Sequence, residues 1–241
     1  KSRFSWEKWD TPAIVVKEKN RNVINEAFRL LRTNLEFMVK KESQSKVIML
    51  TSINPNAGKT FITMNLAAGF AIKEKKVLVI DLDMRKALLS SYVQSSGPGI
   101  ADYLGHQTEE WRSAIVKGNN RGEPDLLPVG TIPPNPTELL FDKRLEQMLE
   151  ELRTEYDYIF VDCPPVEIVA DTSIINKLVD MTLFIVRVGL LDRSLLPEIE
   201  NFYTSGKLRN MSLILNGTML ANARYGYRYG YAYGNDYIDE D

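Results

Sequence analysis

The chain is poor in the residues that several common kinds of site require. Its 241 residues include one cysteine, Cys163, and one histidine, His106. A disulfide framework and a cysteine-rich metal site are therefore excluded, and the low cysteine content suits a reducing compartment. A histidine-based catalytic or zinc mechanism would depend on His106 alone, and its Gly-His-Gln surroundings favour a solvated loop.

Long apolar runs and an excess of one charge sign are also missing. No run of about 18 apolar residues is present, which predicts the absence of a membrane-spanning helix, and no secretory signal peptide is recognisable. The formal net charge is −2 at pH 7, so no global basic field points to nucleic acid as a partner. With 44% hydrophobic residues, the chain can still bury a sizeable core.

The stretch Val47–Thr60, VIMLTSINPNAGKT, combines an apolar strand, a tight loop and the start of a helix. Backbone N–H groups of such a loop and of a helix N-terminus favour an anion. Lys59 would add a positive charge at the outer phosphates, and the Thr60 hydroxyl would be a ligand for Mg²⁺. The match to the general pattern is imperfect, because Ile53 stands where that pattern has glycine. The phosphates are expected to contact Asn56, Ala57, Gly58, Lys59, Thr60 and Phe61.

Two further apolar segments end in aspartate. They are VLVID, which ends at Asp81, and YIFVD, which ends at Asp162. Ligands of an open α/β sheet bind at the carboxyl ends of its strands, so these carboxylates are expected to lie beside the Gly-Lys-Thr loop. Asp83 and Arg85 follow Asp81 closely, which is unusual in a purely structural turn. The alternative is that Asp81 and Asp162 only cap the segments after them.

The rest of the sequence alternates between helix and strand patterns, which predicts one α/β domain with a mostly parallel sheet and helices on both faces. We assign residues 22–220 to this domain, residues 1–21 to a juxtamembrane-like lead-in and residues 221–241 to a tail. Residues 130–137 contain three prolines and are expected to be irregular. Helices are predicted over 22–39, 58–72, 100–104, 109–116, 138–154, 171–178 (capped by Asp171) and 195–205, and strands over 47–50, 77–80, 126–129, 158–161, 182–186 and 212–215.

The first predicted helix carries Glu26, Arg29 and Arg32 three residues apart, beside its apolar face. Side chains at this spacing are neighbours on a helix. On composition alone, such a stripe is typical of a solvated face with local ion pairs.

The tail has a different composition from the rest of the chain. Its tyrosines alternate with small or basic residues and lack aliphatic partners, which predicts a flexible low-complexity segment. Gly226, Gly230 and Gly234 argue against a stable strand. Six of the eleven tyrosines of the chain lie there: Tyr225, Tyr227, Tyr229, Tyr231, Tyr233 and Tyr237.

Together, from about Asn22 to the C-terminus, these segments resemble the catalytic domain of the bacterial tyrosine kinases (BY-kinases) of the Wzc/Cap type, which act in capsular and extracellular polysaccharide export. TSINPNAGKT is similar to the Walker A motif of that family, VLVIDLDMR to its Walker A′, YIFVDCPP to its Walker B and GTIPPNPTELL to its Pro-rich segment. The stripe fits its E-x-x-R-x-x-R helix. Two departures are Asn56, where many members have glycine, and Asn54, where MinD/ParA-type relatives carry a signature lysine.

The resemblance implies a MinD/ParA-like P-loop fold and an ATP- and Mg²⁺-dependent tyrosine autokinase that phosphorylates the clustered tail tyrosines, in trans within a ring-like homo-oligomer held by Glu26, Arg29 and Arg32. It also implies a transmembrane activator, fused or separate, a cognate tyrosine phosphatase and a place at the cytoplasmic face of the bacterial membrane. Asn216 resembles the asparagine that reads adenine in related ATPases, although a turn-forming Asn-Gly explains it equally well.

Roles for the remaining site residues follow from the chemistry of phosphoryl transfer, which requires positioning and charge neutralisation. Thr60, Asp83 and Asp162 are the expected metal-side residues, and Asp81 is the candidate base for the acceptor hydroxyl. Arg85 either neutralises charge near the phosphates or pairs with Asp83.

Two functions of other classes remain open at this point. The first is a MinD/ParA-like ATP-hydrolysing switch, in which water is the acceptor and no phosphotyrosine forms. The second is a non-catalytic interaction domain whose tail binds glycan or RNA by aromatic stacking.

Overall fold

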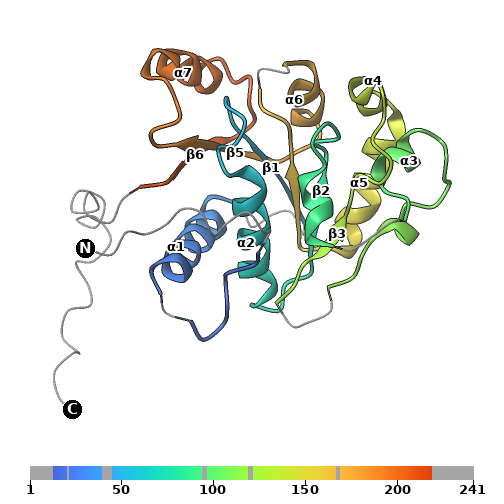
Figure 1. Ribbon diagram of the computed structural model, residues 1–241, viewed down its shortest axis with the longest axis horizontal. Coiled ribbons are helices and arrows are strands. Elements are labelled where there is room, and N and C mark those ends of the chain that lie inside the picture. The colour runs from blue at the N-terminus through green and yellow to red at the C-terminus, as the bar shows by residue number, and fades with distance from the viewer. Residues whose placement is uncertain are drawn as a thin grey trace.

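Six parallel strands form the centre of the computed structural model (Figure 1). The structure describes residues 13–20, 22–39, 45–93, 97–118, 122–166 and 169–218. The strand order is β3-β2-β4-β1-β5-β6. The strands are β1 (Lys46–Thr51), β2 (Val77–Asp81), β3 (Asp125–Leu127), β4 (Tyr158–Asp162), β5 (Met181–Arg187) and β6 (Met211–Asn216).

Helices cover both faces of this sheet, which confirms the predicted fold class (Figure 1). One face is covered by α1 (Val23–Met38) and α2 (Lys59–Ala71). The other face is covered by α3 (Ile100–Leu104), α5 (Lys143–Glu155), α6 (Val169–Asn176) and α7 (Leu196–Thr204). The short helix α4 (Pro136–Leu140) and the 3₁₀ turns η2 (Leu88–Tyr92), η3 (Arg112–Ala114) and η4 (Arg193–Leu195) lie in the connections.

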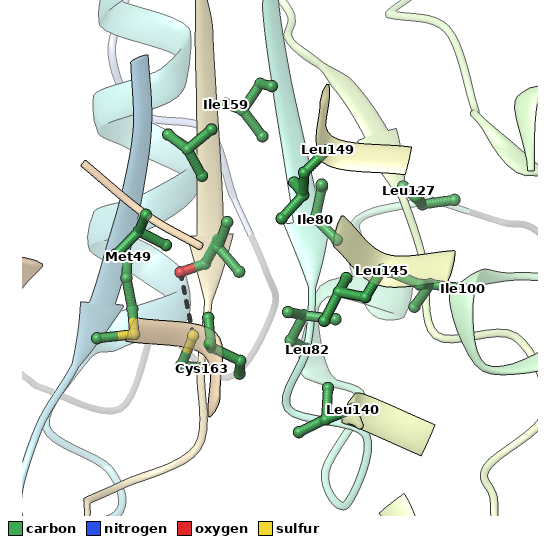
Figure 2. Close-up of a cluster of buried hydrophobic side chains, with 14 of the residues drawn as sticks. Met49, Ile80, Leu82, Ile100, Leu127, Leu140, Leu145, Leu149, Ile159 and Cys163 are labelled. Atoms are coloured by element: carbon green, nitrogen blue, oxygen red, sulfur yellow. Dashed lines mark hydrogen bonds between the residues drawn. The ribbon is translucent and has the colours of Figure 1, made fainter. Parts of the chain in front are cut away.

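Alternate side chains of each central strand enter two separate cores, because successive residues of a strand point to opposite faces. In β1, for example, Met49 enters the core on the side of α5 and α6, whereas Ile48 and Leu50 enter the core on the side of α2. Figure 2 shows this core, where Ile80 of β2 lies toward Leu145 and Leu149 of α5, while Met49 of β1 lies farther along the sheet beside Cys163. Burial on both faces explains why the central strands β1, β2 and β4 have continuous apolar runs instead of alternating patterns.

Four sequence-based boundaries need correction. The helix predicted over 138–154 is two helices, because Asp142 accepts a hydrogen bond from the amide of Arg144 (2.8 Å) and starts α5 anew. The helix predicted over 109–116 is wrong: only η3 forms there, since Val116 makes an antiparallel bridge to Leu126. The strand predicted over 126–129 covers 125–127. Asp171 lies inside the first turn of α6 instead of capping it.

Residues 13–17 are held against α1 and α2 by two buried asparagines. The Asn65 side-chain oxygen of α2 accepts hydrogen bonds from the amides of Val15 (2.7 Å) and Val16 (3.2 Å). The Asn25 side chain of α1 accepts one from the amide of Lys17 (2.7 Å). This end of the predicted lead-in therefore packs on the helices that follow it, and the division at residue 21 remains a prediction.

Within the described ranges, no helix combines the length and apolar character that crossing a membrane requires.

Candidate nucleotide site

The predicted loop and both aspartates meet at one edge of the sheet. Strand β4 lies between β2 and β1, with Asp162 beside Asp81 in one ladder and beside Leu50 in the other. The loop after β1 leads directly into α2, whose first residue is Lys59. The carboxyl ends of three parallel strands therefore bring Lys59, Thr60 and the two carboxylates together, as the sequence predicted.

The last residues of the loop adopt the backbone conformation that a phosphate cradle requires. Gly58 has φ +93° and Asn56 has φ +61°. Asparagine tolerates this left-handed region better than most residues with a side chain, so Asn56 is suited to a position where many members of the resembled family have glycine. Ile53, which replaces the first glycine of the general pattern, is buried in the core beneath the loop.

Among the predicted phosphate contacts, Phe61 has a side chain that lies against another helix. Its ring packs edge-on against Phe28 of α1, with 6.0 Å between the ring centroids. What Phe61 offers at the start of α2 is therefore its backbone amide, as the helix N-terminus argument requires.

Thr60 and Asp162 form the central polar contact of the site. The Thr60 hydroxyl donates a hydrogen bond to Asp162 Oδ2 at 2.6 Å, whereas Asp162 Oδ1 is buried with no hydrogen-bond partner. Burial raises the pKa of Asp162 to about 7, against the lowering effects of Lys59 and of the Thr60 hydrogen bond. A buried carboxylate oxygen without a partner is costly, so this atom is suited to a cation.

Asp81 is fully buried, and the chain around it uses both of its carboxylate oxygens. Oδ1 accepts from the amide of Asp83 (3.1 Å) and Oδ2 from the amide of Leu89 (3.1 Å). Burial, followed by the nearby charges of Asp162 and Asp83, raises the pKa of Asp81 well above its ordinary value. Asp83 is slightly more accessible, at 5% exposure.

Arg85 points away from these carboxylates. Its Nη2 lies 3.2 Å from Asp171 Oδ2 on α6 and donates to the Thr137 hydroxyl of α4 at 3.1 Å. Thr137 in turn donates to Asp171 Oδ1 at 2.5 Å. The pairing of Arg85 with Asp83 considered from the sequence is therefore wrong, and Arg85 links the loop after β2 to the Pro-rich segment.

The residues of this site fit a Mg²⁺-nucleotide better than they fit a metal ion held by protein side chains alone. Among the residues that the structure describes, no group of three or more histidine, cysteine, aspartate or glutamate side chains is arranged to hold a metal ion. Mg²⁺ characteristically binds one or two carboxylates together with water and substrate phosphates. Thr60 and the unpartnered oxygen of Asp162, next to the loop, provide this donor set.

The charged stripe on α1, formed by Glu26, Arg29 and Arg32, makes contacts within the chain. The tail tyrosines Tyr225–Tyr237 lie outside the described residues. Arg29 pairs with Glu26 at 2.8 Å and also donates to the carbonyl of Asn20. Arg32 donates to the Gly69 carbonyl of α2 at 2.9 Å. The local ion pair expected from composition is thus confirmed for Glu26 and Arg29, whereas Arg32 joins α1 to α2.

The sequence did not predict Arg187 as a site residue, and it predicted Asn216 for a different contact. Arg187 and Asn216 are the last residues of β5 and β6 and are partners across that ladder. Arg187 Nη1 donates to the Asn56 carbonyl at 2.9 Å, and Asn216 Nδ2 donates to the Ala57 carbonyl at 2.8 Å. Asn216 was predicted as a site residue but not for this contact, and Arg187 was missed. A charged residue directly after the apolar strand 182–186 was the available signal.

Comparisons with known proteins agree with this geometry. The family model described as "AAA domain" matches residues 45–188. The chain is similar to the tyrosine-protein kinase YwqD of Bacillus subtilis, with 31% identity over 216 residues that cover 89% of this chain and 90% of YwqD. It is also similar to the tyrosine-protein kinase Etk of Escherichia coli K12, with 36% identity over 166 residues, or 68% of this chain.

The chain spans about 22% of the length of Etk. The solved kinase domain of Etk superposes with a TM-score of 0.70 at 30% identity, covering 80% of this chain and 77% of that domain. The septum site-determining protein MinD of Pyrococcus horikoshii OT3 superposes with a TM-score of 0.55 at 22% identity, covering 71% of this chain and 70% of MinD, which shows a shared fold.

Proposed function

This chain belongs to the family of bacterial tyrosine-protein kinases, and from that premise we propose that it transfers the γ-phosphate of ATP to tyrosines of its own C-terminal cluster. The observation that carries the proposal is the Thr60–Asp162 hydrogen bond beside a left-handed phosphate loop, with one oxygen of Asp162 buried and unpartnered. That combination suits a Mg²⁺-nucleotide and has no evident structural purpose.

Each residue contributes a separate physical effect in the proposed reaction. Amides of Ala57 and Gly58 and the ammonium of Lys59 hold the phosphates, and Thr60, Asp83 and Asp162 hold Mg²⁺. The ion, when bound, neutralises charge that develops on the transferring group. Lys59 is 8% exposed, so its charge acts with little screening by water.

The acceptor hydroxyl must lose its proton as it reacts. Its oxygen forms a bond to the γ-phosphorus, the bond from that phosphorus to the bridging oxygen breaks, and ADP leaves. We assign the proton to the Asp81 carboxylate, because burial raises the pKa of this group well above its ordinary value and a carboxylate with a raised pKa is a stronger base. The pH–rate profiles of Asp81→Asn and Asp83→Asn test this assignment: loss of the acidic limb only in Asp83→Asn would transfer the role to Asp83.

A labelling experiment separates the three functional classes. The chain is incubated with γ-labelled ATP and Mg²⁺, beside a Lys59→Met control, and both protein-bound label and released phosphate are measured. Label on tyrosine supports the kinase. Released phosphate without protein label would favour the ATP-hydrolysing switch, and neither product would favour an interaction domain.

Phosphorylation is proposed to occur in trans within a ring-like oligomer. At ~3.4 Å per extended residue, the nine residues from Asn216 to Tyr225 reach up to ~30 Å, so reach permits either route. An oligomer would present each tail at high effective concentration to a neighbouring site. The test mixes Lys59→Met with an active chain whose six tail tyrosines are phenylalanine; an unlabelled Lys59→Met chain would contradict transfer in trans.

Phosphate groups are proposed to drive the oligomer apart afterwards. Each adds about −1.5 to −2 charges, so several on one tail repel one another and the aspartates of the site. Sedimentation before and after complete phosphorylation tests this step, and an unchanged mass would refute it.

The wider setting is proposed from the family. It comprises the cytoplasmic face of the bacterial membrane, a transmembrane activator, an opposing tyrosine phosphatase and control of capsular or extracellular polysaccharide export. The test replaces the wild-type chain with Lys59→Met in its own cell and measures polysaccharide output, which should change.

A further inference from the structure

Two neighbouring strand ends hold the phosphate loop by successive carbonyl oxygens. Arg187 Nη1 at the end of β5 donates to the Asn56 carbonyl (2.9 Å), and Asn216 Nδ2 at the end of β6 donates to the Ala57 carbonyl (2.8 Å). Because Arg187 and Asn216 are partners in the β5–β6 ladder, both donors start from adjacent backbone positions at one edge of the sheet.

Because of peptide geometry, these two hydrogen bonds also fix the direction in which the loop amides point. In a planar trans peptide the carbonyl and the following N–H point in opposite directions. The hydrogen bond from Arg187 to the Asn56 carbonyl therefore turns the Ala57 amide away from the strand ends. The hydrogen bond from Asn216 to the Ala57 carbonyl turns the Gly58 amide away in the same manner. Amides of this kind are the groups that cradle phosphate.

The loop needs such support because its backbone is unusual. Asn56 has φ +61° and Gly58 has φ +93°, and the left-handed region is unfavourable for residues with a side chain. A Cβ atom on Gly58 would come within 2.4 Å of Asn216 Nδ2. Asn216 thus lies directly against the Gly58 backbone, and a side chain at position 58 would displace it.

We infer that Arg187 is a positioning residue which, together with Asn216, fixes the loop amides for the phosphates and so determines phosphate affinity. The inference rests on the proposed nucleotide site, and it adds a residue that neither the motifs nor the adenine role expected for Asn216 would identify. Arg187 acts on the loop carbonyl and does not read the base.

The experiment measures binding of ADP and GDP to the full chain by calorimetry, without any phosphoryl transfer. Arg187→Met keeps an apolar stem of similar length but removes the donor, and Arg187→Lys restores one. The matched control is Arg193→Met, because Arg193 is an exposed arginine of η4 in the same β5–β6 connection. A solvent-exposed, charge-assisted hydrogen bond predicts a loss of roughly 5- to 10-fold in ADP affinity for Arg187→Met.

Three further readouts identify the role. Arg187→Lys should recover about half of the loss on a logarithmic scale, the ADP-to-GDP affinity ratio should stay within twofold of wild type, and the melting temperature without nucleotide should match that of Arg193→Met. An ADP dissociation constant within twofold of wild type in Arg187→Met overturns the inference. A changed base preference also overturns it, because Arg187 would then contact the base. A loss of nucleotide-free stability that matches the loss of affinity would reduce Arg187 to a structural residue and overturn it too.

The proposed kinase function can fail separately. If wild type binds ADP but labels no tyrosine, and Arg187→Met still weakens ADP, the positioning role stands while the kinase assignment falls.

Discussion

Replacing Asp162 with asparagine should stabilise the nucleotide-free protein at neutral to alkaline pH while removing its response to Mg²⁺-nucleotide. Asparagine has nearly the same shape but carries no charge. In the folded chain the Asp162 carboxyl is fully buried, and one of its oxygens has no hydrogen-bond partner. Ionising it there is unfavourable unless a cation is present.

The size of the effect follows from the pKa of Asp162, which burial raises from the ordinary aspartate value of 3.8 to about 7. The folded state holds the proton between these two values and the unfolded state does not, so Asp162 makes stability fall as pH rises through this window. At ~1.4 kcal/mol per pH unit the full difference is ~4 kcal/mol. The asparagine variant, which cannot ionise, should therefore gain about 2–4 kcal/mol over wild type at pH 8 and almost nothing at pH 4.

The nearby carboxylate Asp81 adds to this gap in the same direction. Its pKa is raised partly by the charge of Asp162, so removing that charge makes Asp81 easier to ionise. The difference between variant and wild type therefore reports the two carboxyls together.

Urea unfolding of both chains at pH 4, 6 and 8, without nucleotide and then with Mg²⁺-ADP, measures these effects. Glu200→Gln, which removes an exposed carboxyl of α7, controls for loss of one negative charge. Mg²⁺-ADP should stabilise wild type much more than Asp162→Asn at pH 8. A stability difference that does not change with pH, or an asparagine variant less stable than wild type at pH 8, would refute the reasoning.

Three further predictions concern other parts of the structure. Lys59→Met should lower the rate of autophosphorylation by at least ~100-fold, because a buried charge at the phosphates is removed, while its circular dichroism spectrum should match that of wild type. Labelling at the wild-type rate would contradict the role of Lys59. Arg29→Ala with Arg32→Ala should give a smaller species in sedimentation, and Arg32→Ala alone should also lower stability by about 1 kcal/mol through its lost bond to Gly69; an unchanged mass would return the stripe to a purely local role. Asp171→Asn should lower stability by ~2 kcal/mol, because the buried partner of Arg85 and Thr137 loses its charge. In urea unfolding, the double variant with Arg85→Met should then lose less stability than the sum of the two single variants. Full additivity would show that the two residues are not coupled.

The sequence by itself determined the class of fold and predicted which residues meet at the candidate nucleotide site. Apolar runs that end in Asp81 and Asp162, and a Gly-Lys-Thr at the start of a helix, reflect local constraints, because strands buried on both faces must be apolar and ligands bind at their carboxyl ends. The helix break at Asp142 was missed because residues on either side continue the helical composition, and only the capping bond to Arg144 reveals it.

Contacts between distant parts of the chain were decided by tertiary structure alone. Arg85 pairs with Asp171, 86 residues further on, and Arg187 reaches Asn56 across 131 residues. No local pattern records these pairings, because each depends on which strands become neighbours and on how their ends align. The pKa values of Asp81 and Asp162 belong to the same category, since burial sets them and burial is a property of the assembled sheet.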